Sequence, residues 1–211
     1  MARAAKALPR DHPDRPPPVT PIWRRETGRR ILVLTGTDVH TFDRICAWAD
    51  ARAGARPDEE VVVQHGFTTP PRIARGVQLL TPAELIGALD AADAVISHGG
   101  PGTISTVRAA GHTPIIVPRD PALGEHVDDH QLRFAAWAAD RRLGVVIHDV
   151  ARLDDAVDRA ARTMSSDDAR ARQVEESLRV LSARLVALSQ GDGRRRAIPL
   201  LQRARWGRIR G

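Results

Sequence analysis

The chain has 211 residues, 42% of them apolar, so it is long enough to bury the core of one domain. Its net charge of +6 is carried by its two ends, because residues 1–30 hold eight basic and three acidic residues and residues 194–211 hold seven arginines and no acid. The middle of the chain is therefore acidic, so we expect no nucleic-acid partner, and the single cysteine, Cys46, excludes a disulfide framework.

The predicted elements begin with an N-terminal extension, residues 1–30. It contains the Pro-rich text DHPDRPPPVTP and lacks apolar periodicity, which is typical of a disordered segment. Its start has no apolar region of a signal peptide, and no apolar run along the chain is long enough to span a membrane. We therefore expect a cytoplasmic protein.

Short apolar runs rich in valine and isoleucine alternate with amphipathic stretches from residue 31 onward. The runs predict strands at residues 31–36, 60–66, 77–80, 94–97, 114–118 and 144–148. Helices are predicted near residues 42–53 and 82–91, from about residue 102, near residues 125–139, and after the last strand to about residue 188. Continuous apolar strands between helices indicate a parallel sheet covered on both faces. The predicted fold is a doubly wound, Rossmann-like α/β domain over residues 31–190.

The C-terminal tail, residues 191–211, is basic and has arginines interleaved with isoleucine, leucine and tryptophan. One interpretation is a solvated tail. The other is peripheral contact with the inner face of the cell membrane, in which arginines meet anionic head groups while Leu200 and Trp206 enter the acyl boundary.

Two loops follow predicted strands at the edge of the sheet where this class of fold binds ligands: TGTDVHTF (residues 35–42) and SHGGPGT (residues 97–103). The second has three interpretations: a phosphate-binding loop, a tight turn, or a catalytic pair of Ser97 and His98. Glycines let the backbone approach a ligand, and the N-terminus of the following helix favours a phosphate. Adjacent residues at a strand end point to opposite faces, which argues against the pair. No Walker A pattern is present, so ATP hydrolysis is not expected.

A third cluster, GEHVDDHQ at residues 124–131, combines histidines with acidic residues. His126 and His130 are four residues apart, as on one face of a helix, but the HExxH order of zinc-dependent proteases is absent. The alternative is a hydrogen-bonding edge over a polar ligand, in which Gln131 and a histidine donate to hydroxyl or phosphate groups. We expect this second role and no bound metal.

The series SHGGPGT, AAGHTPIIVPRD and GEHVDDHQLRFA resembles the C-terminal, nucleotide-sugar-binding half of the family 28 glycosyltransferases, the MurG-like group. ILVLTGTDVHTFDR and VVVQHG resemble the first two strands of its short one-domain members, among them subunits of exopolysaccharide transferases. The resemblance covers about residues 31–150. It implies one half of a GT-B glycosyltransferase, in which this chain holds a UDP-sugar donor and a second domain or partner chain holds the acceptor.

The resemblance also assigns donor-binding residues by position. Gly36 and Thr37 are expected against the donor phosphates, and His130 and Gln131 at the sugar hydroxyls. Arg119 is expected in a supporting ion pair or at a phosphate. Contacts to the diphosphate and nearby donor groups are expected from His98, Gly99, Gly100, Gly102 and Thr103.

The sequence departs from the family on the helix after the glycine loop. Members usually carry an acidic residue there that binds both ribose hydroxyls, whereas the matching residue here is Thr106. A threonine can make only one such bond and carries no charge. Three outcomes stay open: weaker donor binding, substitution by another acid such as Glu125, or loss of UDP-sugar binding.

The implied reaction is an inverting transfer without a metal or other cofactor, in which an acceptor hydroxyl attacks the anomeric carbon and UDP leaves. Loop amides and a helix N-terminus stabilise the leaving diphosphate. The general base of the two-domain relatives lies in their other half, and His40 is interpreted as a solvated loop histidine, so no catalytic residue is assigned here. We expect a hexosyltransferase subunit of exopolysaccharide synthesis in the cell envelope, acting with a membrane-attached acceptor-binding subunit. The alternative is a non-catalytic nucleotide-binding or scaffold module of the same fold.

Overall fold

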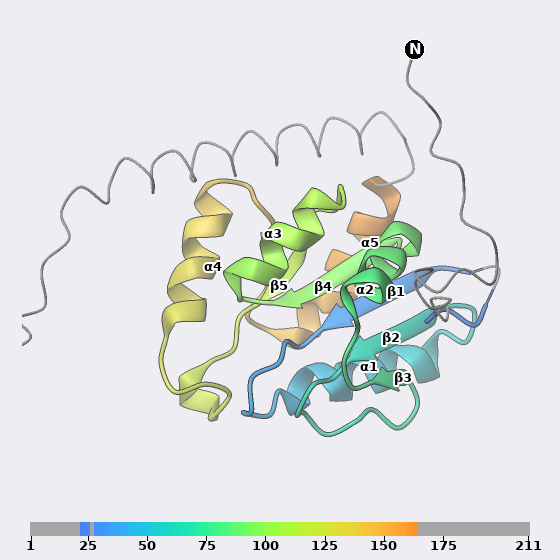
Figure 1. The fold of residues 1–211 in the computed structure, drawn as a ribbon, viewed down its shortest axis with the longest axis horizontal. Coiled ribbons are helices and arrows are strands. Elements are labelled where there is room, and N and C mark those ends of the chain that lie inside the picture. Colours follow the sequence, from blue (N-terminus) through green and yellow to red (C-terminus); the bar gives the residue numbers. More distant parts are fainter. Residues whose placement is uncertain (1–21, 26–27, 164–211) are drawn as a thin grey trace, which may run out of the picture.

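The computed structural model describes residues 22–25 and 28–163 (Figure 1). They form one parallel sheet with the strand order β3-β2-β1-β4-β5-β6. This order is that of the doubly wound dinucleotide-binding fold, so the predicted Rossmann-like α/β class is confirmed. The strands are β1 (Arg30–Leu34), β2 (Glu60–Gln64), β3 (Arg75–Val77), β4 (Ala94–His98), β5 (Ile115–Val117) and β6 (Val145–Val146).

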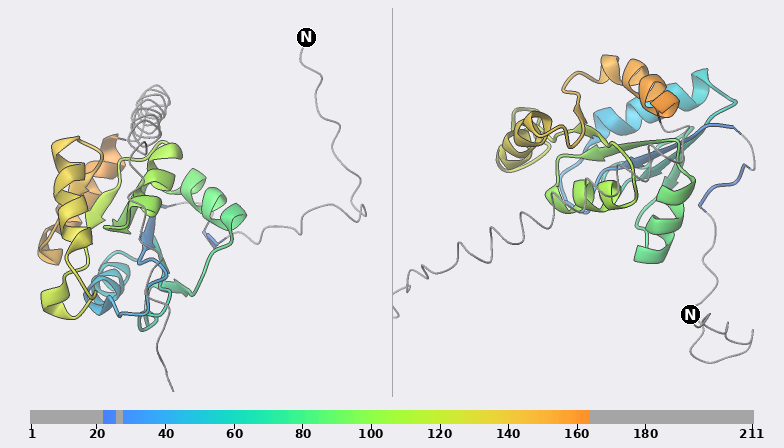
Figure 2. Two further views of the ribbon diagram at one scale, coloured as in Figure 1. Left: turned by 60° about the vertical axis from the view of Figure 1, so that its left-hand side comes forward. Right: turned by 90° about the horizontal axis from the view of Figure 1, so that it is seen from above.

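Helices cover both faces of the sheet (Figure 2). They are α1 (Asp43–Ala55), α2 (Pro82–Ala91), α3 (Pro101–Ala109), α4 (His130–Asp140) and α5 (Leu153–Thr163), with 3-10 turns at Pro121–Leu123 and Val150–Arg152. Ile31 and Val33 of β1 pack with α1 and α5, whereas Leu32 and Leu34 pack with α2 and α3 on the other face. Alternate residues of a strand are therefore buried on opposite faces, which explains why its sequence is continuously apolar.

The packed part of the chain begins before the predicted domain start at residue 31. Ile22 is buried in the cluster beneath α2, and the indole Nε1 of Trp23 donates to the carbonyl of Ala88 at 3.3 Å. The backbone N–H groups of Arg24 and Arg25 donate to the carboxylate of Glu60 at 2.8 and 2.9 Å. Apolar burial and this carboxylate hold the segment against the sheet, although the sequence places it in a disordered extension.

α5 covers the start of the helical region predicted after the last strand, whereas residues 1–21, 26 and 27, the part of that region beyond residue 163, and the basic tail lie outside the described residues. Within the part of the chain that the structure describes, no helix has the length and apolarity that a bilayer crossing needs.

Among the element boundaries that differ from the prediction, two bear on the site. β3 ends at Val77 instead of covering residues 77–80, because Leu79 and Leu80 leave the sheet and lie beside a pocket at its edge. α4 begins at His130 instead of near residue 125, because the Asp128 carboxylate accepts the N–H of His130 and closes a turn just before the helix. Both differences concern the edge of the sheet where the loops carry the predicted site residues.

A buried ion-pair cluster fastens α1 to α5. Arg52, whose side chain is 2% exposed, donates to both carboxylate oxygens of Glu59 at 2.6 and 2.8 Å. It also donates to Asp154 in the first turn of α5 at 2.9 Å and to Asp158 in the middle of α5 at 2.7 Å. Because four short hydrogen bonds satisfy this buried guanidinium, the cluster holds two helices of distant sequence on the same face of the sheet.

Candidate functional site

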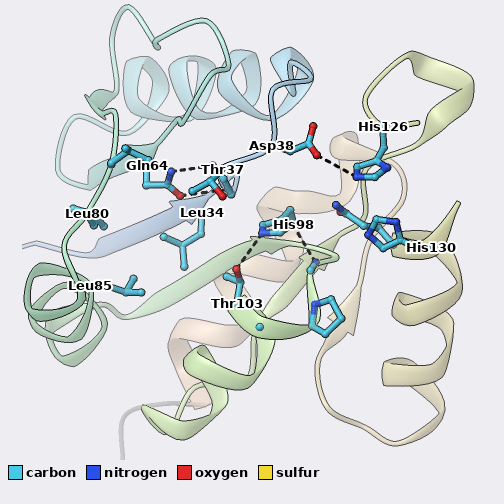
Figure 3. A pocket seen from close by; sticks show the side chains of 16 residues that line it. Leu34, Thr37, Asp38, Gln64, Leu80, Leu85, His98, Thr103, His126 and His130 are labelled. Carbon is cyan, nitrogen blue, oxygen red and sulfur yellow. Dashed lines mark hydrogen bonds and ion pairs between the residues drawn. The ribbon is translucent and has the colours of Figure 1, made fainter. Parts of the chain in front are cut away.

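A pocket of about 520 Å³ opens at the carboxyl edge of the sheet, between the loop after β1 and the loop after β4 (Figure 3). Strand order reverses between these two strands, so their loops diverge and leave a crevice in which folds of this class bind ligands. Both loops that the sequence singled out therefore meet at one site.

The pocket has three regions, which follow one another in Figure 3. The leucine end is formed by Leu34, Leu79, Leu80 and Leu85. The glycine loop, in the middle, is formed by Gly100, Pro101, Gly102 and Thr103 at the start of α3. The histidine end is formed by Asp38, His126 and His130. Of the other predicted donor-binding residues, the pocket is lined by Gly36, Thr37, His98 and Gln131.

His98, the last residue of β4, anchors the glycine loop through both of its ring nitrogens. Its Nδ1 accepts the N–H of Gly100 at 3.1 Å, so Nε2 carries the proton of the neutral ring and donates to Oγ1 of Thr103 at 3.0 Å. Burial, and then the positive charge of Arg119, lower the pKa of His98 to about 4. The ring is therefore neutral at physiological pH and shapes the loop.

Two glycines leave room for the His98 ring. A β-carbon at Gly100 would overlap His98 Cε1, and one at Gly36 would lie 2.6 Å from Nε2. Gly36 also has a φ of +87°, a conformation that other residues rarely adopt. The side-chain amide of Gln64 holds this turn, since it donates to the Gly36 carbonyl at 3.0 Å and accepts the Gly36 N–H at 3.3 Å. Sequence analysis did not find Gln64, which lies in a run of β-strand residues.

The N-terminus of α3 opens on the pocket without a capping side chain. Its N-cap residue is Gly100, which has no side chain that could accept the first-turn N–H groups. A β-carbon at Gly102 would meet nothing within 4 Å, so the space over this turn is open to a ligand. The unpaired N–H groups and the positive end of the helix dipole favour an anion there.

Gln131 and Gly99 brace the glycine loop from behind. Oε1 of Gln131 accepts the N–H of Gly99 at 3.0 Å and the N–H of Arg119 at 3.2 Å. Gln131 is buried at the pocket wall, whereas Gly99 does not line the pocket. The side-chain oxygen of Gln131 is therefore occupied by two backbone N–H groups. Only the side-chain nitrogen is left for the predicted contact with a sugar.

Thr106 and Glu125 do not line the pocket. The hydroxyl of Thr106 is exposed on α3 and donates to the carbonyl of Gly102 at 3.0 Å. The buried Glu125 carboxylate accepts from the Arg44 guanidinium at 2.8 and 3.1 Å and from the N–H of Asp120 at 2.9 Å. Because Glu125 is bonded in this way and does not line the pocket, the structure gives no support for Glu125 as the substitute acid, and the three outcomes stay open.

Arg119 donates hydrogen bonds to backbone carbonyls and does not line the pocket. Its side chain is fully buried, and its two terminal nitrogens donate to four carbonyls. Three of these carbonyls belong to the loop after β1, and the fourth belongs to Glu125. This placement corrects the predicted ion pair or phosphate contact, because the guanidinium ties the two walls of the pocket together from beneath.

The histidine end contains imidazole–carboxylate pairs that sequence analysis did not find. Oδ1 of Asp38 pairs with Nδ1 of His40 at 2.6 Å, and Oδ2 of Asp38 lies 3.3 Å from Nε2 of His126. Oδ1 of Asp128 pairs with Nδ1 of His130 at 2.5 Å, and the rings of His126 and His130 meet edge to face at 4.4 Å. Both short pairs come from an Asp-X-His triplet, DVH and DDH, and this repeat is the signal visible in the sequence.

Asp38 is held in its ionised form. Burial raises its pKa, but hydrogen bonds from the backbone and the ring of His40 outweigh burial, and the pKa lies below its usual value. His40 is half-buried, is fixed by this carboxylate and does not line the pocket. His40 was predicted to be a solvated loop histidine. In the structure Asp38 fixes the orientation of its ring beside the pocket.

Acidification is expected to destabilise the protein through His98. Its folded pKa of about 4 lies below the ordinary 6.5, so the unfolded chain takes up a proton that the folded chain does not as the pH falls below 6.5. Between about pH 7.5 and about pH 5, the free energy of unfolding should fall by about 1–2 kcal/mol more in the wild type than in His98→Asn. Urea unfolding at both pH values measures this difference, and equal losses in the two proteins would contradict it.

The solved structures that share this fold include three glycosyltransferases. The calicheamicin glycosyltransferase CalG4 has a TM-score of 0.55 and 22% identity, over 82% of this chain and 44% of its own. The glycosyltransferase of kitacinnamycin has a TM-score of 0.53 and 23% identity, over 80% of this chain and 44% of its own. The spinosyn forosaminyltransferase SpnP has a TM-score of 0.51 and 23% identity, over 80% of this chain and 47% of its own. This chain thus spans less than half the length of these enzymes, and a likeness at this identity is one of fold.

The fold is that of the C-terminal, Rossmann-like half of GT-B glycosyltransferases, as the sequence resemblance implied. No curated protein sequence matches the chain. Residues 52–185, more than half of the chain, match the sequence profile of the glycosyltransferase family 28 C-terminal domain. They include the glycine loop, α3 and the histidines at 126 and 130. The chain therefore belongs to the glycosyltransferase family 28 C-terminal domain family.

Proposed function

We propose that this chain is the donor-binding subunit of an inverting glycosyltransferase that moves a sugar from a UDP-sugar to a lipid-linked or polysaccharide acceptor. The observation that carries the proposal is the uncapped start of α3, which opens on the pocket beside the free space over Gly102. A helix N-terminus in this position suits a diphosphate, which is the group that every nucleotide-sugar donor shares.

The order of the three pocket regions matches the order of groups in such a donor. The leucine end offers apolar contact to a nucleobase, and the glycine loop lies next to it at the start of α3. The histidine end follows on the far side, where ring nitrogens can bond sugar hydroxyls. A nucleotide-sugar laid across the pocket therefore meets apolar, anion-binding and hydrogen-bonding surfaces in sequence.

In the proposed reaction an acceptor oxygen attacks the anomeric carbon, the bond from this carbon to the diphosphate breaks, and UDP leaves with the bonding electron pair. First-turn N–H groups of α3 stabilise the negative charge that develops on the diphosphate. His98 keeps these donors in place without carrying charge itself. The acceptor proton passes to a general base of the partner.

A partner that binds the acceptor fits the exposed rim of the pocket. The chain spans less than half the length of the glycosyltransferases that share its fold. Val39 and Val127, next in sequence to Asp38 and His126, are 69% and 74% exposed, and such apolar side chains suit a surface that another domain covers. We place this partner on the inner face of the cell membrane in exopolysaccharide synthesis, with the basic tail as a further membrane contact.

One observation favours the alternative, a non-catalytic nucleotide-binding or scaffold module. The described residues place no carboxylate at the matching position on α3, since Thr106 is turned to its own helix and Glu125 is bound to Arg44. A ribose would then be held more weakly than in the rest of the family. The two proposals differ in whether UDP binds and whether a sugar is transferred.

Gly102→Asp is expected to weaken UDP binding at least tenfold and to leave the fold intact. A β-carbon at Gly102 would meet nothing within 4 Å, and a carboxylate in the first turn of a helix is stabilising. It would face the diphosphate, and repulsion of about 1.4 kcal/mol corresponds to a factor of ten in affinity. Calorimetric titration of the full chain with UDP measures the change.

Gly87→Asp is the matched control, because Gly87 is an exposed glycine of α2 with the same empty surroundings and does not line the pocket. Its UDP affinity should equal that of the wild type. Equal affinity in both variants would place the diphosphate elsewhere. If neither UDP, TDP, GDP nor ADP binds the wild type, the scaffold alternative is favoured.

A further inference from the structure

We propose that His126, Asp128 and His130 form a binding site for a divalent transition-metal ion at the histidine end of the pocket. One ligand atom of each residue lies within 4.8 Å of the others. The proposal differs from the expectation drawn from the sequence, in which the HExxH order is absent and no metal was expected. In the structure His126 precedes α4 and His130 is its first residue, so the turn between them brings the rings together.

The separations of the ligand atoms fit a single ion. Two ligands of one tetrahedral ion are about 3.3–3.5 Å apart when each bond is about 2.0–2.2 Å long. Nδ1 of His126 lies 3.5 Å from Oδ1 of Asp128, which is this separation. Nδ1 of His130 lies 2.5 Å from the same oxygen and must move outward by about 1 Å. The His130 side chain is 42% exposed, so packing restrains this movement less than it would that of a buried ring.

The charges around His126 suit a cation. Its ring lies between two carboxylates, with Nε2 3.3 Å from Asp38 and Nδ1 3.5 Å from Asp128. A neutral imidazole has one N–H, which Asp38 can accept, so the lone pair of Nδ1 then faces the Asp128 oxygen. The N–H of Asp128 reaches this lone pair only at 3.3 Å. A cation between Nδ1 and Oδ1 bonds both acceptors, whereas an anion there would be repelled by Asp128.

Asp38 provides the outer support that metal-binding histidines need. A histidine ligand usually donates its second ring nitrogen to a carboxylate, which fixes the ring and increases its basicity. His126 has such a partner in Asp38, and its side chain is only 10% exposed. Asp38 is itself held by the backbone N–H and the ring of His40 at 2.8 and 2.6 Å. His126, the least exposed of the three ligands, is therefore held in a fixed orientation by Asp38.

The donor set selects the class of metal. Two imidazole nitrogens and one carboxylate oxygen suit Zn²⁺, Co²⁺ and Fe²⁺, whereas Mg²⁺ and Ca²⁺ prefer sites made of oxygen alone. Three protein ligands leave at least one coordination position open. His126 and His130 both line the pocket, so this position is open to a molecule bound there. Binding of the ion itself does not depend on the proposed donor.

Co²⁺ titration of the full chain, produced without a polyhistidine tag, tests the site by the visible absorption of the bound ion. We expect one Co²⁺ per chain, displaced by Zn²⁺ and unaffected by excess Mg²⁺ or Ca²⁺. His126→Ala and His130→Ala should each abolish the absorption band. Asp38→Asn should weaken Co²⁺ binding about 10- to 100-fold without abolishing it, because it removes only the outer support.

His148→Ala is the control for binding to surface histidines, because His148 is exposed and does not line the pocket. It should bind Co²⁺ like the wild type, and urea unfolding of each variant checks that the fold persists. The proposal is overturned if the wild type gives no saturable band, or if the band survives in His126→Ala or His130→Ala. Since no nucleotide is added, failure here leaves the proposed glycosyltransferase function standing, and failure of UDP binding leaves the metal site standing.

Discussion

Replacing Arg119 with alanine is expected to lower the free energy of unfolding by about 3–5 kcal/mol, the largest effect we predict for a single side chain. The guanidinium is 0% exposed and donates to the carbonyls of Thr35, His40, Thr41 and Glu125 at 2.6–3.3 Å. Each buried carbonyl left without a donor costs about 1–3 kcal/mol, offset in part by water that enters the space. The cation also lies over the Phe42 ring at 4.9 Å, and that contact is lost as well.

Urea denaturation measures the loss, with two comparison variants. Arg119→Lys keeps the charge but cannot reach both pocket walls with one ammonium group, so it should lose about half as much. Arg133→Ala removes an exposed arginine whose ion pair with Asp129 lies on the surface of α4, and it should cost about 0.5 kcal/mol or less. If Arg119→Ala lost no more stability than Arg133→Ala, the carbonyls would not depend on the guanidinium.

The sequence predicts the sheet well because each strand is buried on both faces. Continuous valine and isoleucine runs identify β1, β2, β4 and β5, and their alternation with helices predicts the parallel order. The helix predicted near residues 82–91 is α2, whose start is fixed by a capping box in which Thr81 and Glu84 bond each other's backbone. These signals are local, so a single sequence contains them.

The partners of polar side chains in the pocket walls could not be predicted in this way. Glu125 binds Arg44, which is 81 positions away, and Arg119 donates to carbonyls as far as 84 positions away. Asp38 and His126 meet only because two loops of different strands share one edge of the sheet. Such pairings depend on the completed fold, and a pattern of residue types along the chain does not contain them.

The glycines of the SHGGPGT motif show the same limit. The sequence suggests one role for all three, close approach of the backbone to a phosphate. In the structure a β-carbon at Gly99 would lie 2.9 Å from the Gln131 β-carbon, whereas one at Gly100 would overlap the His98 ring. Only Gly102 faces open space. Two of the three glycines therefore serve packing inside the protein, and one is left to face a ligand.

Gly100→Ala is accordingly expected to lower the free energy of unfolding by about 2–3 kcal/mol and to abolish measurable UDP binding. The added methyl group meets His98 Cε1, and the ring cannot move aside because Gly100 N–H and Thr103 Oγ1 hold its two nitrogens and Gly36 lies against it. Relief requires the first turn of α3 to shift away from the pocket. Gly102→Ala is the matched control two positions along, and it should leave the free energy of unfolding within about 0.5 kcal/mol of the wild type.

A second substitution distinguishes this clash from a general intolerance of alanine at the start of the helix. In a His98→Ala background the ring is gone, so adding Gly100→Ala should cost no more than about 0.5 kcal/mol beyond the single variant. The double-mutant cycle, measured by urea unfolding, thus yields a coupling free energy of about 2 kcal/mol between the two positions. Additive losses in the cycle would mean that Gly100 is needed for its own backbone conformation and that His98 does not determine the shape of the loop.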